Sequence, residues 1–350
     1  MRKFIFAVVL MLSIVFIIGQ FAELQSLVET VQRGDWRYLG LALIIQTAWL
    51  LTLASSFLVI FQALGIDEKV ENLLLIATAA NFVNIIAPSG GMGGMALIAT
   101  EARRRNYSPA RAAIASALHL FFDYLGFIVV LALGLIVLVR RNHLTTVEIT
   151  ASAILVTIAV VLAILLFLGM KSGEALGKAL SWMVRLVNRV VHPITHREYL
   201  SEARACEFAH DAADGLQELR QEPRKLLLPI GLALVNKTLL ICVLLFTFLA
   251  FQVPVSAGTI VAGFSIGYLF LIVSPTPAGL GIVEGALTII ISSMYIPLEA
   301  AAVVTLVYRG ITFWYPLVFG MIAFRILGRP VQPGKPGTND PLKNIDAHSI

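Results

Sequence analysis

Ionisable side chains stand inside long apolar stretches of this sequence, where their chemistry would be most consequential. They are His119, Asp123, Lys237, Glu284 and Arg309. A charge within hydrocarbon is costly, so such residues are candidates for ligand binding or proton transfer when their segment lies in a membrane. The guanidinium of Arg309 offers a planar fork of donors that suits a phosphate group. The structural alternative is a buried ion pair of Arg309 with Asp123 or Glu284, and the two roles can coexist.

The other ionisable residues also allow two interpretations each. His119 and Asp123 stand four residues apart, on one face of a helix, where they would relay protons or form a structural pair. Lys237 lies about ten residues into its apolar segment, too deep to reach an interface, so we expect it to face the interior. Glu284 follows a chain break directly, which suits either an N-terminal helix cap or a proton-coupled or cation-binding carboxylate.

Two glycine-rich breaks, residues 88–94 and 275–281, interrupt the apolar chain and begin new helices. A helix N-terminus presents free N–H groups and a positive dipole end, which suit a phosphate or carboxylate. We therefore predict two facing anion sites whose substrate-binding residues are Gly90, Gly91, Gly93, Gly94, Gly279 and Gly281, with Asn84 just before the first break. The alternative is that the glycines serve only tight turns and close helix packing.

The composition places the chain in a membrane. It is 58% hydrophobic and 13% charged, whereas soluble domains carry about 25% charged residues. No basic patch with interleaved aromatic residues indicates nucleic acid. His119 and Asp123 alone supply too few ligands for a metal, and Ser89 with His119 lacks the setting of a serine nucleophile. We expect no metal, no cofactor and no enzymatic activity.

Six apolar runs are expected to cross the membrane, which makes the fold class an all-α polytopic membrane protein. The runs are residues 4–19, 38–63, 110–139, 149–170, 226–251 and 299–327. We expect the first to be a retained span, because no clear signal-peptide cleavage site follows it. Two shorter runs, residues 73–87 and 258–273, end at the glycine breaks. Each is short of the roughly 20 residues that a crossing needs, so each is predicted to form a re-entrant helical hairpin with the run after its break.

Lys and Arg concentrate on cytoplasmic loops of membrane proteins. With both hairpins re-entrant and the N-terminus inside, 20 basic residues lie inside and four outside, and Lys237 and Arg309 lie in the membrane. This asymmetry predicts a multi-pass protein of the cell membrane with both termini cytoplasmic. The first hairpin then enters from inside and the second from outside.

The two halves of the chain resemble each other. Gly91 and Gly93 precede Gly279 and Gly281 by 188 residues. We therefore predict an inverted-topology repeat, with repeat one at residues 1–140 and repeat two at residues 149–328. In transporters of this plan the site lies near midplane, where broken helices meet.

Two polar segments flank this pattern. Residues 171–225 form a cytoplasmic loop that begins with an amphipathic helix, expected either to lie on an anionic membrane surface or to pack on the bundle. Residues 329–350 are rich in proline and glycine, and we expect a disordered cytoplasmic tail after a transmembrane domain of residues 1–328.

The motifs resemble those of the lysylphosphatidylglycerol synthase transmembrane (flippase-like) family. The similarity rests on Asn84-x-x-x-Pro88-x-Gly-Gly-x-Gly-Gly, on Pro275-x-Pro277-x-Gly279-x-Gly281-x-x-Glu284, and on Tyr308-Arg309 ahead of Trp314. It implies inverted halves with re-entrant helices, translocation of a phospholipid or lipid-linked headgroup between leaflets, and site roles for Glu284 and Arg309. Full-length aminoacyl-lipid synthases carry a soluble catalytic domain after the membrane region. This sequence ends at residue 350, so we expect a stand-alone member without synthase activity.

The expected function is therefore lipid translocation, with the headgroup held midplane by the two broken helices and Arg309. The partner would be an anionic phospholipid, an aminoacyl-phospholipid or a polyprenyl-phosphate-linked sugar, supplied by a separate lipid synthase or glycosyltransferase. One alternative is a proton- or ion-coupled carrier of a soluble anion, with Asp123, His119 and Lys237 as relay residues. Another is a non-transporting membrane partner that docks a glycosyltransferase through residues 171–225.

Overall fold

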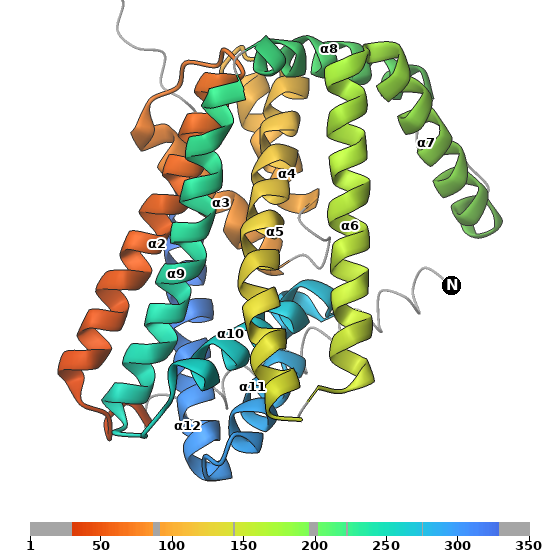
Figure 1. Ribbon diagram of the computed structural model, residues 1–350. Coiled ribbons are helices and arrows are strands. Elements are labelled where there is room, and N and C mark those ends of the chain that lie inside the picture. Colours follow the sequence, from red (N-terminus) through yellow and green to blue (C-terminus); the bar gives the residue numbers. More distant parts are fainter. Residues whose placement is uncertain are drawn as a thin grey trace, which may run out of the picture.

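The computed structural model describes residues 30–86, 92–142, 144–195, 202–221, 223–274 and 276–328, and the regular elements in these ranges are all helices (Figure 1). The all-helical fold class is thus confirmed. The helices are α2 (Trp36–Ala63), α3 (Val70–Ile86), α4 (Met92–Arg104), α5 (Pro109–Arg140), α6 (Thr146–Lys171), α7 (Gly173–Thr195), α8 (Glu202–Gln221), α9 (Leu227–Ala250), α10 (Ala257–Val273), α11 (Ile282–Ser293), α12 (Leu298–Arg309) and α13 (Tyr315–Leu327). Short 3-10 turns cover Pro223–Leu226 and Pro277–Gly279, and a π-helical segment, Gly310–Trp314, joins α12 to α13.

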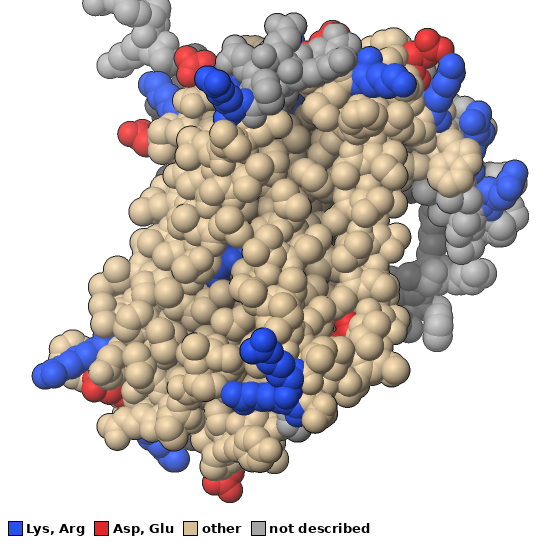
Figure 2. Space-filling model, viewed as in Figure 1, with Lys and Arg blue, Asp and Glu red and all other residues tan. Residues whose placement is uncertain are grey.

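Five helical segments of the described chain are long and apolar enough to cross a membrane. They are Trp36–Ala63, Pro109–Arg140, Thr146–Lys171, Arg224–Ala250 and Leu298–Leu327. Most of the charged side chains visible in Figure 2 lie toward the two ends of the bundle, and an uncharged surface covers much of the length between them. The chain is therefore a multi-pass membrane protein. The expected first span, residues 4–19, and the tail, residues 329–350, lie outside the described residues.

The first hairpin, α3 and α4, begins and ends at one end of the bundle. Arg105, just after α4, pairs with Glu68, just before α3, at 3.2 Å between Nη1 and Oε2. The next helix, α5, starts beside them and runs for 32 residues, or about 48 Å at the rise of an α-helix. The first hairpin therefore lies at the N-terminal end of α5.

The second hairpin, α10 and α11, starts at the opposite end. Ser256 caps α10, and its Oγ accepts a hydrogen bond of 3.0 Å from Nη2 of Arg141, the C-cap residue directly after α5. The helices α10, α11 and the start of α12 gather at this end in Figure 1. The two hairpins thus begin at opposite ends of the bundle, and their helices, of 12 to 17 residues, are shorter than the five candidate spans.

The long helices brace the hairpins crosswise. The helix α2 packs against α9, while α3 packs against α13 and α10 packs against α5. Glycines allow α5 to approach α10 closely and α13 to approach α3 closely. A methyl group at Gly134 of α5 would overlap Ser265 of α10, and one at Gly320 of α13 would lie 2.5 Å from Cβ of Phe82 on α3. Each hairpin is therefore held by a long helix from the other half of the chain.

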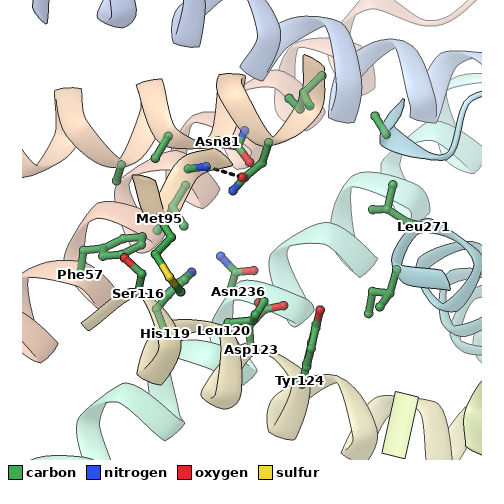
Figure 3. A pocket seen from close by; sticks show the side chains of 18 of the residues that line it. Phe57, Asn81, Met95, Ser116, His119, Leu120, Asp123, Tyr124, Asn236 and Leu271 are labelled. Atoms are coloured by element: carbon green, nitrogen blue, oxygen red, sulfur yellow. Dashed lines mark hydrogen bonds between the residues drawn. The ribbon is translucent and has the colours of Figure 1, made fainter. Parts of the chain in front are cut away.

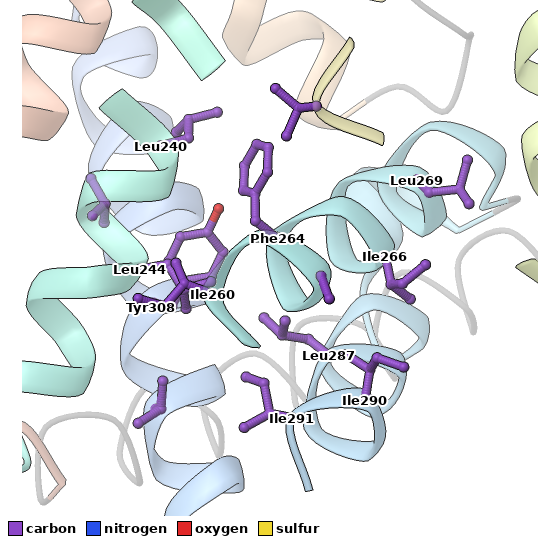
Figure 4. Close-up of a cluster of buried hydrophobic side chains, with 14 of the residues drawn as sticks. Leu240, Leu244, Ile260, Phe264, Ile266, Leu269, Leu287, Ile290, Ile291 and Tyr308 are labelled. Carbon is purple, nitrogen blue, oxygen red and sulfur yellow. The ribbon is translucent and has the colours of Figure 1, made fainter. Parts of the chain in front are cut away.

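Buried apolar side chains hold the second hairpin against its neighbours. Leu240 and Leu244 of α9, Phe264 of α10, Leu287 of α11 and Tyr308 of α12 belong to one cluster (Figure 4). Within a bilayer such contacts stabilise through van der Waals packing, because lipid is as apolar as the side chains. Four helices are thereby fixed around the residues that follow the second break.

The polar segment between α6 and α9 forms two helices. α8 packs against α5, α6 and α7, and α7 packs against α8 and slopes away from α6 in Figure 1. Leu176 and Val184 of α7 are buried, whereas Trp182 is 60% exposed. One side of α7 therefore packs on the protein, and another side remains open.

Candidate functional site

A cavity of about 370 Å³ lies where the two hairpin tips approach each other. Asn84 and Gly94 line it from the first hairpin, and Ser274, Thr276 and Ala278 line it from the second. The tips of hairpins that start at opposite ends therefore share one cavity inside the bundle. Gly90 and Gly91 of the first break lie outside the described residues.

Polar side chains of α3 and of the long helices α5 and α9 complete the cavity wall. Asn81, Asn236 and Asp123 stand on one side of the space and Leu271 on the other (Figure 3). Trp49 also lines the cavity, and its Nε1 donates to Oδ1 of Asn236 at 2.9 Å. The cavity therefore offers amide and carboxylate groups beside apolar walls, as ligand sites commonly do.

The turn of the second break has a left-handed backbone. Gly279 and Gly281 have φ angles of 73° and 79°, and Ala278 has a φ of 50°. Glycine occupies such conformations at no steric cost, whereas alanine is strained there. The two glycines therefore allow a tight reversal between α10 and α11.

Arg309 and Glu284 fasten this turn. Nε of Arg309 donates to Oε1 of Glu284 at 2.6 Å, and its Nη2 donates to the carbonyl oxygen of Ala278 at 2.8 Å. Oε2 of Glu284 accepts from the N–H of Gly281 at 2.6 Å. Arg309 is 4% exposed, and its guanidinium lies 5.6 Å from the ring centre of Phe313. Of the alternatives left open, the structure shows the Arg309–Glu284 ion pair and the helix cap by Glu284.

The first tip is closed in a similar way. Oδ1 of Asn84 accepts from the N–H of Gly94 at 2.7 Å. A Cβ at position 94 would lie 2.8 Å from the carbonyl oxygen of Ala80, so Gly94 also permits close packing of α4 on α3. The N–H groups of Gly94 and Gly281 were expected to bind an anion, and in this conformation each is bonded to a side chain of its own hairpin.

A second ionic cluster lies deeper in the wall. Nζ of Lys237 donates to Oδ1 of Asp123 at 2.5 Å and to the hydroxyl oxygen of Tyr268 at 2.6 Å. That hydroxyl donates to Oδ2 of Asp123 at 3.0 Å. Asp123 lies on α5, whereas Lys237 and Tyr268 lie on α9 and α10. Asp123 therefore pairs with Lys237 and not with Arg309, and the sequence did not indicate Tyr268.

His119 stands beside this cluster, one turn before Asp123. Its ring stacks on Phe57 at 4.3 Å between ring centres. His119 and Asp123 line the main cavity and also a void of about 10 Å³ behind it, a volume near that of one water. The two residues predicted to share a helix face thus separate two spaces. Within the described residues no three His, Cys, Asp or Glu side chains gather as metal ligands would.

A bundle of long apolar helices defines the class, that of multi-pass membrane proteins. Within that class, residues 4–320 match the family model described as the lysylphosphatidylglycerol synthase TM region. The chain belongs to this family, and the resemblance seen in the sequence is confirmed. The family ties the protein to lipid handling at a membrane. No curated protein matched the chain.

Proposed function

We propose that this protein moves an anionic phospholipid or lipid-linked headgroup between the leaflets of the cell membrane, as a transporter and not as an enzyme. The observation that carries the proposal is the cavity of about 370 Å³ shared by both hairpin tips. A cavity that offers polar groups between broken helices of an apolar bundle is the arrangement of many transporter sites.

The proposal treats the two hairpins as re-entrant and the two halves as an inverted repeat. The crosswise bracing supports this interpretation. α3 packs against α13 as α10 packs against α5, and each contact passes over a glycine, Gly320 in one and Gly134 in the other. Two halves with the same contacts but opposite entry ends allow the cavity to open alternately toward either leaflet.

In this mechanism the headgroup enters the cavity and meets Asn81, Asn236, Ser274 and Thr276, while the acyl chains remain in lipid. The Arg309–Glu284 pair fastens the turn of the second hairpin. When the tips part, the N–H groups of Gly94 and Gly281 and the guanidinium of Arg309 become available to the phosphate. The end that carries Arg103, Arg104 and Arg105 faces the cytoplasm, following the charge asymmetry.

One observation favours a second candidate, a proton- or ion-coupled carrier of a soluble anion. The ionisable residues His119 and Asp123 line the cavity, and Lys237 is fully buried behind them. Such groups at membrane depth are typical of ion-coupled transport. This candidate predicts uptake of a soluble anion that depends on an ion gradient and no movement of lipid.

Purified protein in liposomes tests the proposal. Labelled phosphatidylglycerol, aminoacyl-phosphatidylglycerol and a polyprenyl-phosphate sugar are placed in one leaflet, and their appearance in the other is followed by chemical quenching. We expect protein-dependent movement of at least one of them. Asn81→Trp should fill the cavity and abolish movement, whereas Gln62→Trp, at an exposed position of α2, should not. If none of these lipids moves faster than in protein-free liposomes, the proposal fails.

A further inference from the structure

The charged group of Lys237 is buried directly behind the cavity wall and does not line the cavity. Its side chain is 0% exposed, whereas that of Asp123 is 17% exposed. Asp123 lines the cavity and Lys237 does not. The carboxylate therefore stands between the cavity and the buried ammonium group.

The carboxylate of Asp123 is held as a bound anion would be. One oxygen accepts from Nζ of Lys237 at 2.5 Å, and the other accepts from the hydroxyl of Tyr268 at 3.0 Å. A cationic donor and a neutral donor thus converge on one small anionic group. Charge-assisted hydrogen bonds of this kind are the strong ones in anion recognition.

Both donors are held in place without Asp123. Nζ of Lys237 also donates to the hydroxyl oxygen of Tyr268 at 2.6 Å and lies 4.0 Å from the centre of its ring. That ring packs against Phe264 at 5.5 Å and Phe127 at 4.7 Å between ring centres. The two donors therefore contact each other and the neighbouring rings in addition to the carboxylate.

We propose that Lys237 and Tyr268 form an anion-exchange site, in which the phosphate group of a substrate in the cavity displaces the carboxylate of Asp123. The inference rests on the proposed function and adds the residues that bind the headgroup phosphate. Asp123 keeps the buried cation paired while the cavity is empty, because an unpaired charge at this depth is costly. The incoming phosphate takes over that pairing, and the Asp123 carboxylate takes up a proton from solvent as it moves to the cavity wall beside His119, so that no unpaired anion is left.

The exchange also loosens the bundle between its halves. Asp123 belongs to α5 of the first half, and its two partners belong to α9 and α10 of the second half. In the empty state the ion pair ties these helices together. When a phosphate replaces the carboxylate, that tie is released, so binding of the substrate favours movement of the two halves relative to each other.

Retention of lipid by variants of the full chain tests the exchange. The protein is placed in nanodiscs of phosphatidylglycerol and phosphatidylcholine, and the lipids that remain bound are measured by native mass spectrometry. We expect Asp123→Asn to retain several-fold more phosphatidylglycerol than the wild type, because the competing carboxylate is gone. Tyr268→Phe should retain less, and Lys237→Met should lose the preference. The exposed matched controls Asp211→Asn and Lys171→Met should behave as the wild type does.

The double variant Asp123→Asn with Lys237→Met guards against misfolding, because it leaves no unpaired buried charge. It should remain monodisperse and show no preference for phosphatidylglycerol. If Asp123→Asn and the double variant both retain phosphatidylglycerol as the wild type does, the exchange site is wrong.

Two further arms separate the exchange site from the proposed function. Normal lipid movement by the double variant in liposomes would overturn the exchange site and leave the proposed function standing. An Asp123-dependent lipid preference without any lipid movement by the wild type would support the exchange site and overturn the proposed function. Inorganic phosphate is added as a competitor in the nanodisc experiment. If the wild type binds inorganic phosphate but shows no preference for phosphatidylglycerol, the site belongs to a soluble anion and the lipid assignment is overturned.

Discussion

The ion pair of Arg309 and Glu284 is the contact at the second tip whose removal we expect to lower the free energy of unfolding most. Glu284→Gln keeps the shape of the side chain but removes its charge from two hydrogen bonds, one from Arg309 and one from the N–H of Gly281. Hydrogen bonds to charged groups contribute about 1.5–3 kcal/mol each. Because the amide keeps one acceptor oxygen, the expected loss of unfolding free energy is about 2–3 kcal/mol.

Arg309→Gln should cost at least as much. It removes the cation from a partly buried carboxylate and the donor from the carbonyl oxygen of Ala278. Breaking a buried pair by removing one partner costs about 3–5 kcal/mol. The side chain of Glu284 is 21% exposed, so we expect the lower end, about 3 kcal/mol. The double variant leaves no unpaired charge. The sum of the losses of unfolding free energy in the two single variants should therefore exceed the loss in the double variant by about 2 kcal/mol.

The measurement is a double-mutant cycle in mixed micelles, with unfolding driven by an increasing fraction of SDS and followed by circular dichroism. Glu299→Gln and Arg325→Gln serve as the matched controls, because both residues are exposed and lie on α12 and α13. The controls should be nearly neutral and additive. A coupling of Glu284 with Arg309 below about 0.5 kcal/mol would show that the two side chains act independently, and the clamp on the turn would be refuted.

Three further substitutions test other parts of the structure, with thermal unfolding in the same micelles as the measurement. Gly320→Ala should destabilise by about 1–3 kcal/mol because its methyl group overlaps α3, whereas Gly40→Ala, with open space around it, should be neutral or stabilise by up to about 1 kcal/mol; equal effects would contradict the close packing. Asn84→Ala should cost about 1 kcal/mol through loss of the cap on the N–H of Gly94, and an unchanged midpoint would mean that the cap contributes nothing. Ala278→Gly should stabilise by at most about 1 kcal/mol, because it relieves a φ of 50° at some cost in chain entropy, and a marked loss would show that the methyl group packs usefully.

The sequence predicts the tip contacts better than the deeper cluster. Glu284 stands three residues after Gly281, which is the spacing of a cap, and Arg309 lies about ten residues into the last apolar run. Local spacing and charge were therefore enough to name this pair as one of the alternatives. The partner of Lys237 is 114 residues away along the chain, and only the packing of α5 against α9 brings Asp123 to it.

Other features carry no local signal at all. Tyr268 lies in an apolar helix where its ring is typical of packing, and its hydroxyl gains a role only from the neighbours that surround it. The π-helical segment Gly310–Trp314 interrupts the last span directly after Arg309, and nothing in the apolar pattern marks it. The retained first span, the disordered tail and the roles of Gly90 and Gly91 remain predictions, because these residues lie outside the described part of the chain.

The crosswise bracing has a consequence for the barrier function of the membrane. A channel open to both sides at once would let protons and salts run down their gradients. In this fold α13 packs against α3, and the same span contains α12, whose Arg309 bonds the turn of the second hairpin. Likewise α5 packs against α10 and follows α4 of the first hairpin. A displacement that loosens one hairpin therefore also displaces a long helix that packs against the other hairpin. If the protein moves a lipid headgroup as proposed, we expect this linkage to prevent the cavity from opening to both sides at once, so that ions do not leak.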